Sequence, residues 1–383
     1  MRKDFLIFGS PHLGAAEQQE VLDSMQQAWL GTGPKVEQFE SAFSEYKSAP
    51  AVAAVSSCSA ALHLSCLALG LKPGDEVITT AMTFCATINA IIHAGATPVL
   101  ADIDPATLNI DPQEVVKKIT SKTRAILVVH FAGRPCAMSE ISAIAKKYKL
   151  KVIEDCAHAL ETEYHGQKAG TLGDLGCFSF YATKNITTGE GGMVISRDEA
   201  LVETVKVLAM NGLSADAWQR FSDEGYKHYA VTGLGFKYNM MDLQAAIGIH
   251  QLKKVEAFWH RREKLWGFYM ENLQALPLTL PLPAESQTRH GYHLFTIRID
   301  EERAGITRDD FLQEMTRRKI GVGVHYLPIP EHPYYRTTYG WDPAAYPHAR
   351  KYGFETVSIP LSPKLSDRDA MDVVEAITDI LSS

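Results

Sequence analysis

The chain has 383 residues, 46% of them hydrophobic, and its 38 basic and 45 acidic residues leave a net charge of 38 − 45 = −7. The length predicts two domains, or one large domain with an appendage, and the composition is ordinary for a globular protein. The mildly acidic balance, without a long basic run, argues against nucleic acid as a partner.

The sequence predicts neither secretion nor a membrane span. The N-terminus lacks a signal-peptide pattern, and the longest apolar tract, residues 51–71, is interrupted by serines and a histidine. The six cysteines form no CxxC pair, which favours buried thiols in a reducing compartment over a disulfide frame or a metal site. We therefore expect a cytoplasmic protein without a metal or a membrane partner.

Helices and strands alternate through the first half of the chain. Helical spacing of apolar residues predicts helices over residues 17–29 and 36–46, with the turn 30–34 between them. Apolar runs predict strands over 51–55, 76–80, 97–103, 123–130 and 150–154, separated by helices near 57–69, 84–93, 112–119 and 138–148. This alternation indicates a mostly parallel sheet with helices on both faces, and ligands bind such sheets beyond the carboxyl ends of the strands.

Polar residues follow two of these strands. Small residues, three of them serines, lead over 56–61 from strand 51–55 into the next helix, where unpaired backbone N–H groups suit a phosphate. The alternative is a plain helix cap by Ser57 or Ser59. Asp155 ends an apolar strand, where a carboxylate is costly unless it is paired, although a helix cap is again an alternative.

A single lysine, Lys184, lies in a turn between two strand-like segments, residues 177–181 and 193–196. Small polar residues precede it, and a Gly-Glu-Gly-Gly turn follows at 189–192. A lysine held there can lose part of its hydration, which lowers its pKa and frees its amine for imine chemistry. The alternative is a solvated loop lysine.

The pattern changes after Gly248. Helical and strand-like segments are predicted over 255–273 (helix), 293–299 (strand), 308–319 (helix), 321–326 (strand) and 367–381 (helix). We predict a large domain over residues 1–248 and a smaller α+β domain over 249–383.

The segment 178–185 and the following Gly-Glu-Gly-Gly resemble the cofactor-lysine segment of the DegT/DnrJ-type sugar aminotransferases. These are pyridoxal 5'-phosphate (PLP) enzymes of the aspartate aminotransferase fold, fold type I. The similarity covers nearly the whole chain, because further motifs follow in the family's order. It implies an α/β fold whose large domain has a central, mostly parallel sheet flanked by helices.

The resemblance also implies residue roles. Lys184 would hold PLP as an imine and later move protons as general base and acid. Asp155 would pair with the ring nitrogen, and His158 would lie near the phenolic oxygen. Three further residues would contact the cofactor phosphate: Ser59, Ala60 and Ser179. Phe84 would stack on the cofactor ring. From the residues alone, Phe84 could equally be a core side chain.

Two further groups follow from the resemblance. The substrate side would include Trp29, Thr32, His325 and Tyr326, although Trp29 could simply pack. Asn239 would reach the cofactor phosphate of a partner subunit, with Lys237 as the alternative. The stretch 211–229 carries three basic residues that could meet a substrate phosphate or remain solvated: Arg220, Lys227 and His228.

The implied reaction moves an amino group from an amino acid, with L-glutamate as the donor, to a keto sugar that is nucleotide-linked in most of the family. Pyridoxamine 5'-phosphate (PMP) would be the intermediate cofactor, the enzyme a homodimer with shared active sites, and the product an amino sugar for a polysaccharide. Alternatives are a keto sugar without a nucleotide, a PMP-dependent sugar dehydratase and a non-catalytic sensor. Lys184 argues against the dehydratase, where a histidine replaces the lysine. The absence of GxGxxG after an early strand argues against a nicotinamide enzyme.

Overall fold

The computed structural model describes residues 2–213 and 230–382. Its centre is a seven-stranded sheet in the order β1-β9-β8-β5-β4-β2-β3. The strands are β1 (Ala51–Val55), β2 (Glu76–Thr80), β3 (Thr97–Ala101), β4 (Thr123–Val129), β5 (Lys151–Asp155), β8 (Leu175–Ser179) and β9 (Gly192–Ser196). β9 pairs antiparallel with both neighbours, whereas β8, β5, β4, β2 and β3 are parallel. The mostly parallel sheet is confirmed.

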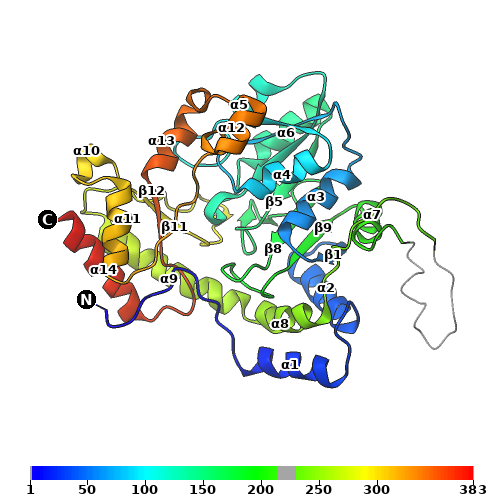
Figure 1. Cartoon of the computed structure of the whole chain (residues 1–383), viewed down its shortest axis with the longest axis horizontal. Helices are drawn as coiled ribbons and strands as arrows, with labels where there is room; N and C mark the ends of the chain where they lie inside the picture. Colours follow the sequence, from blue (N-terminus) through cyan, green and yellow to red (C-terminus); the bar gives the residue numbers. More distant parts are fainter. Residues whose placement is uncertain (1, 214–229, 383) are drawn as a thin grey trace.

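Helices cover both faces of this sheet (Figure 1). One face packs on α3 (Cys58–Ala68), α4 (Cys85–His93) and α7 (Glu199–Ala209). The other packs on α2 (Pro34–Lys47), α5 (Pro112–Lys118), α6 (Met138–Tyr148) and α8 (Asp242–Lys253), and α1 (Ala15–Gln26) lies on α8. Alternate residues of β1 join opposite cores, Ala53 on the first face and Val52 on the second. The strands are apolar on both faces for this reason.

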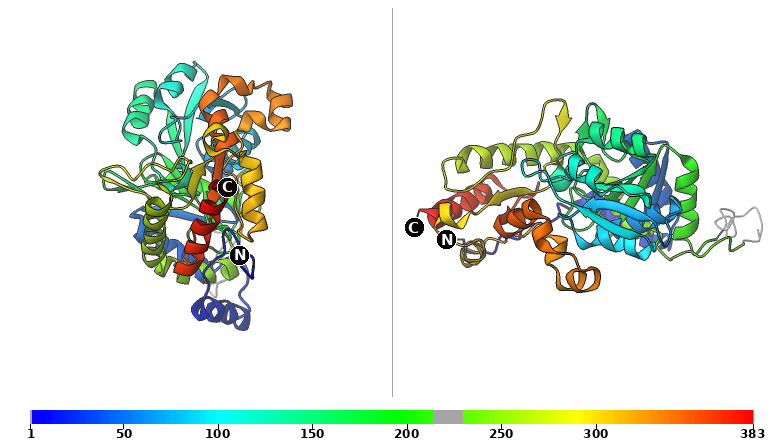
Figure 2. Two further views of the ribbon diagram at one scale, coloured as in Figure 1. Left: turned by 90° about the vertical axis from the view of Figure 1, so that its left-hand side faces the viewer. Right: turned by 90° about the horizontal axis from the view of Figure 1, so that it is seen from above.

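A second core lies in the C-terminal part, which sits beside the sheet in Figure 2. Its long helix α9 (Val255–Leu273) starts in the core of the sheet and ends in this second core. The other elements of this core are β11 (Phe295–Arg298), α10 (Glu301–Ala304), α11 (Arg308–Arg317), β12 (Thr356–Ile359) and α14 (Asp367–Leu381). Helices α12 (Pro333–Tyr339) and α13 (Pro347–Glu355) instead pack on the sheet domain, against Met82 and Ile88. The short strands β6 (Glu163–Tyr164), β7 (Gln167–Lys168) and β10 (Thr288–Arg289) form a separate sheet.

The strand predicted over 321–326 is wrong. The segment forms only an isolated bridge between Gly323 and Ser358, and the partner of β11 is β12. Gly321 donates instead to the carbonyl of Leu6, at 2.8 Å. The apolar pattern of this segment therefore reflects packing between two neighbours, not a continuous ladder.

The predicted division after residue 248 falls inside α8. That helix packs on α1 and α2, with the sheet domain. The domain boundary itself stays a prediction. Within the described ranges, no helix is long and apolar enough to cross a bilayer.

Candidate active site

A cavity of about 510 Å³ opens at the carboxyl ends of the parallel strands. It brings together most of the residues predicted for the cofactor site: Ser59, Phe84, Asp155, His158, Ser179 and Lys184. His325 and Tyr326 reach it from the C-terminal part. Side chains distant in sequence therefore converge on one concave site, as a ligand site requires.

Lys184 comes from the turn that follows β8. Backbone bonds from Phe180 N to Gly191 O and from Thr188 N to Phe180 O, both 2.9 Å, close this turn. Burial lowers the pKa of Lys184 to about 8, although the nearby Asp155 opposes the shift. About a tenth of the amine is therefore unprotonated at pH 7, far more than for an ordinary lysine, and this free amine is the form that acts as a nucleophile or a general base.

Asp155 ends β5 at the base of the cavity. Its Oδ2 accepts from the Thr87 hydroxyl at 2.9 Å and its Oδ1 from the backbone N–H of Ala157 at 3.1 Å. Because Thr87 donates to Asp155, the Thr83 hydroxyl 2.7 Å away must donate to Thr87. Burial raises the pKa of Asp155, although the nearby Lys184 opposes the shift. A protonated pyridine nitrogen would supply the charged contact that a buried carboxylate favours.

His158 is neutral, and its hydrogen bonds fix its tautomer. The backbone N–H of Ala132 donates to His158 Nδ1 at 3.3 Å, so this nitrogen carries no proton. Burial holds the pKa of His158 well below its usual range. Its proton therefore sits on Nε2, 3.0 Å from the Tyr326 hydroxyl. His158 donates to Tyr326, which leaves the Tyr326 proton for an acceptor in the cavity.

The first turn of α3 lines the cavity at the place predicted to bind the phosphate. Ser57 caps the helix by accepting from Ala60 N at 3.1 Å, so Ser57 is the cap. Ala60 is buried and does not line the cavity, whereas Cys58 and Ser59 do. Their backbone N–H groups lie in a first turn, which leaves such groups unpaired inside a helix. Together with Ser179 across the cavity, they fit a phosphate dianion.

The Gly-Glu-Gly-Gly turn packs directly on this helix start. A Cβ atom on Gly192 would lie 2.5 Å from the carbonyl oxygen of Ser57 and 2.7 Å from Cys58 N. Only glycine permits this approach without displacement of the backbone. The motif therefore holds the Lys184 turn against the predicted phosphate site.

Aromatic side chains line the wall of the cavity. Phe84 keeps 57% of its surface exposed, and its ring centroid lies 6.0 Å from that of Tyr326. An exposed ring at the cavity wall fits the predicted stack on a planar cofactor better than a core role. His325 Nδ1 lies 2.8 Å from the Ser358 hydroxyl, and burial lowers the pKa of His325 to about 4. Phe84, Tyr326 and a neutral His325 thus surround the entrance.

Trp29, Thr32 and Asn239 lie together elsewhere, on a second cavity of about 450 Å³. Asn239 Nδ2 donates to Thr32 Oγ1 at 2.5 Å. Lys237 points to Met210 Sδ at 3.4 Å. In a single chain, none of the three predicted residues lines the Lys184 cavity, so their predicted substrate and partner-phosphate roles require a second subunit.

Most of the stretch 211–229, with its three candidate phosphate contacts, lies outside the described residues. Arg220, Lys227 and His228 lie outside the described residues. Their predicted contact with a substrate phosphate stays a prediction.

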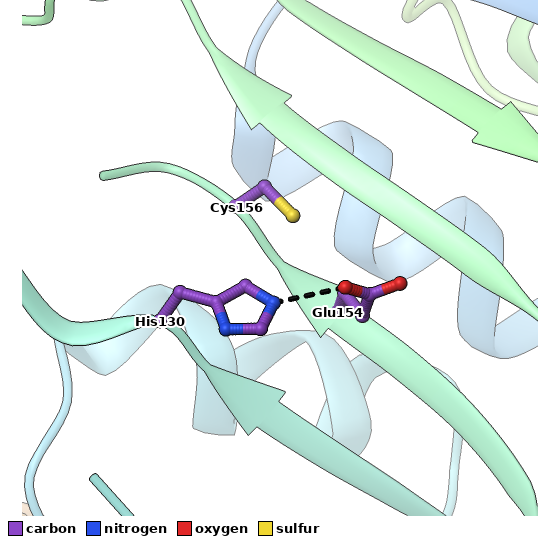
Figure 3. A group of neighbouring side chains, drawn as sticks. All are labelled: His130, Glu154 and Cys156. Atoms are coloured by element: carbon purple, nitrogen blue, oxygen red, sulfur yellow. Dashed lines mark hydrogen bonds and ion pairs between the residues drawn. The ribbon is translucent and has the colours of Figure 1, made fainter. Parts of the chain in front are cut away.

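A cluster behind the site has the residue types of a metal centre. The ligand atoms of His130, Glu154 and Cys156 lie within 4.8 Å of one another (Figure 3). However, Cys136 N donates to His130 Nδ1 at 3.0 Å, so His130 Nε2 carries the proton and donates to Glu154 at 2.9 Å. Glu154 also accepts three backbone N–H groups at 2.6–2.8 Å: Gly170, Leu172 and Gly173. Because these hydrogen bonds occupy the Glu154 oxygens and the His130 ring nitrogens, the cluster stabilises β5 beside Asp155 and has a structural role.

Sequence reasoning missed several residues of the site. Thr83 and Thr87, which support Asp155, flank Phe84 at the start of α4, Thr83 just before the helix and Thr87 in its first turn. Tyr181 and Glu190 line the cavity on either side of the lysine turn. No spacing signal identifies these two, because the turn alone decides which side chains face inward.

Comparison with known proteins identifies similar chains over almost the full length. A model of the DegT/DnrJ/EryC1/StrS aminotransferase family matches residues 11–378. The chain is 45% identical over 381 residues to the spore coat polysaccharide biosynthesis protein SpsC of Bacillus subtilis, covering 99% of this chain and 98% of SpsC.

Solved structures agree. The PMP form of Spr1654 from Streptococcus pneumoniae superposes with a TM-score of 0.93 at 30% identity, covering 98% of this chain and 99% of that one. A PLP form of the same protein gives 0.92 at 29% identity, covering 99% of both. Helicobacter pylori PseC, an aminotransferase of pseudoaminic acid biosynthesis, gives 0.91 at 26% identity, covering 99% and 100%.

Proposed function

Because the chain belongs to the DegT/DnrJ/EryC1/StrS aminotransferase family, we propose that this PLP-dependent sugar aminotransferase takes its amino group from L-glutamate and gives it to a nucleotide-linked keto sugar. The observation that carries the proposal is the single cavity that joins Lys184 to Asp155 and His158. The names of SpsC and PseC connect those relatives with polysaccharide and sugar-acid biosynthesis. We assign the product of this enzyme to an amino sugar of a surface polysaccharide.

PLP, when bound, supplies an aldehyde that reacts with amines and a cationic ring that withdraws electrons from the reacting carbon. Asp155 would keep the ring nitrogen protonated by pairing with it. Lys184, whose pKa is about 8, would take the proton from the donor's alpha carbon and deliver it to the cofactor carbon. Tyr326, which accepts from neutral His158, would donate its proton to an oxygen in the cavity.

The proposal includes a homodimer. Thr32 and Asn239 are hydrogen-bonded to each other on a cavity that Lys184 does not reach. In the proposed dimer this pair would complete the active site of the neighbouring subunit, with Trp29 at its edge. Sedimentation tests this part, since an active monomer would contradict it. The cytoplasmic location stays a prediction for cell fractionation.

The test of the proposed function is the absorbance spectrum of the purified enzyme with PLP, before and after L-glutamate. We expect a visible band that glutamate converts to a near-ultraviolet band. Lys184→Met should lose both the visible band and the conversion. Lys47→Met is the matched control, because Lys47 is also a buried lysine with a pKa lowered by burial to about 8, but its Nζ donates to Leu160 O at 3.0 Å, outside the cavity.

The outcomes separate the alternatives. A protein that does not bind PLP would favour a non-catalytic sensor. A coloured protein whose spectrum does not change with glutamate would support PLP as the cofactor but would require a different amino donor. After conversion by glutamate, the enzyme would be screened against keto sugars with and without a nucleotide to identify the acceptor. A reaction only with sugars that carry no nucleotide would contradict the proposal of a nucleotide-linked acceptor.

A further inference from the structure

A group of buried polar side chains lies behind the Lys184 turn, and none of the assigned proton transfers uses it. Its centre is Asn185, the residue next to Lys184. The Asn185 amide donates to Glu161 Oε2 at 2.6 Å and to Gly291 O at 2.8 Å. Its oxygen lies 2.7 Å from Nδ1 of His293. Since both amide hydrogens are used, the oxygen must accept, and His293 Nδ1 carries a proton.

His293 connects this group to the active site. Its ring stacks on His158, with centroids 4.3 Å apart and planes at 29°. Its backbone N–H donates to Ala132 O at 3.0 Å, while Ala132 N donates to His158 Nδ1 at 3.3 Å. Ala132 is held at φ 56°, in the left-handed region. The two histidines thus carry their protons on opposite nitrogens, and one short segment fixes both rings.

The surrounding charges keep His293 neutral. Burial is the main cause that holds the pKa of His293 well below its usual range, and the titratable groups facing it act in the same direction: His158, Lys184, Arg262 and His325. Burial raises the pKa of Glu161 to about 7 against Arg262 and Arg289, and Tyr46 and Lys47 also face this carboxyl. Glu161 Oε1 and Arg262 Nε have no hydrogen-bond partner among the described residues. The Asn185 amide is therefore the side-chain hydrogen-bond donor of the Glu161 carboxyl, at Oε2.

We propose that Asn185 and His293 are positioning residues of this aminotransferase. Asn185 fastens the Lys184 turn to three segments of the chain, at Glu161, Gly291 and His293. His293 fixes the plane and the proton of His158, which in turn directs the Tyr326 proton into the cavity. Reacting groups must be held to within a fraction of an ångström for efficient transfer. The inference rests on the proposed roles of Lys184 and His158.

The test compares Asn185→Ala and His293→Phe with wild type. Phenylalanine keeps the stack on His158 but loses the bond to Asn185. His290→Phe is the matched control, because His290 is equally buried and stacks on Tyr292 with centroids 4.9 Å apart, but it does not contact Asn185 or His158. The readouts are cofactor content, the pH midpoint of the visible band, and the rate of conversion by glutamate.

We expect both network variants to bind PLP, to move the midpoint by about half a pH unit or more, and to convert about tenfold more slowly at saturating glutamate. The glutamate concentration at half-maximal rate should change by less than about twofold, because positioning acts on the chemical step. His290→Phe should match wild type in all three. If Asn185→Ala fails to fold, Asn185→Asp removes the same two donors at almost the same volume.

Two different results would contradict the positioning inference and the proposed function separately. If the network variants titrate and react like His290→Phe, the positioning inference is overturned and the proposed function stands. If wild type shows no visible band, or Lys184→Met keeps the conversion, the proposed function fails first.

Discussion

The substitution Asp155→Asn removes the negative charge of this side chain in the cavity and leaves its size and shape almost unchanged. The asparagine oxygen can still accept from Ala157 N, the bond that measures 3.1 Å in wild type. Its amide would face the Thr87 hydroxyl, which now donates to Asp155 at 2.9 Å. The Thr83–Thr87 pair at 2.7 Å can reverse its direction, so that Thr87 accepts from the amide and donates to Thr83. Every hydrogen bond is thus retained, and only the charge is lost.

The loss of charge should slow the reaction without destabilising the fold. An opposite charge in contact shifts a pKa by about 1–3 units, equivalent to about 1.4–4 kcal/mol. If this stabilisation of the protonated ring is expressed in the transition state, conversion by glutamate falls by about 10- to 1,000-fold. The assay is the decay of the visible band after rapid mixing with saturating glutamate, which does not require the sugar acceptor.

In the cofactor-free enzyme, the same substitution is expected to raise stability or leave it unchanged, although it lowers the reaction rate. Burial raises the pKa of Asp155 in the folded chain. A raised pKa means that this group's contribution to stability is present at low pH and is lost as pH rises through the folded pKa. Cofactor-free Asp155→Asn should therefore melt at or above the wild-type temperature at pH 8. Conversion within threefold of wild type, or a clear loss of stability at pH 8, would refute the reasoning.

Three further experiments probe other parts of the site. Uptake of PLP by the cofactor-free enzyme should accelerate as pH rises through about 8 and level off above it, because only the unprotonated Lys184 amine reacts; a rate that falls over this range would contradict the shifted pKa. Tyr326→Phe keeps the ring beside Phe84 but loses the hydroxyl that His158 contacts, so conversion should slow by about 10²-fold or more with an unchanged melting curve; equal rates would remove Tyr326 from the proton transfer. Glu154→Gln places an amide hydrogen among donors and should lower the free energy of unfolding by about 1–3 kcal/mol, measured by denaturant titration. Added zinc should leave the wild-type free energy of unfolding unchanged, because the Glu154 oxygens already accept four hydrogen bonds; stabilisation of wild type by zinc would identify a metal site.

Much of the site could be predicted from local patterns. Apolar runs mark β5 and β8, and the polar residues that end them, Asp155 and Ser179, reach the same sheet edge because parallel strands share a carboxyl end. Lys184 was singled out by the resemblance of segment 178–185 and the following Gly-Glu-Gly-Gly to the family, since a lone lysine in a turn could equally be solvated. Gly192 shows why that turn contains glycine, since it touches Ser57.

Other features were not visible in the sequence. Ala60 fits a phosphate-binding motif, yet its N–H is taken by the Ser57 cap. The expected strand over 321–326 failed because apolar alternation cannot tell a ladder from two isolated contacts. Thr87 supports Asp155 only because β5 and α4 meet, and no local signal reports that contact.

The sequence by itself determined the strands of the central sheet, their mostly parallel arrangement and the identity of the residues at its carboxyl edge, because these depend on the period of apolar residues and on strand direction. The tertiary structure decided the protonation of the site. Which nitrogen of His158 carries its proton, and how far the pKa of Lys184 falls, depend on burial and on partners such as Ala132, Tyr326 and Asp155. Those partners come from distant segments, and desolvation acts only once the chain has folded around them.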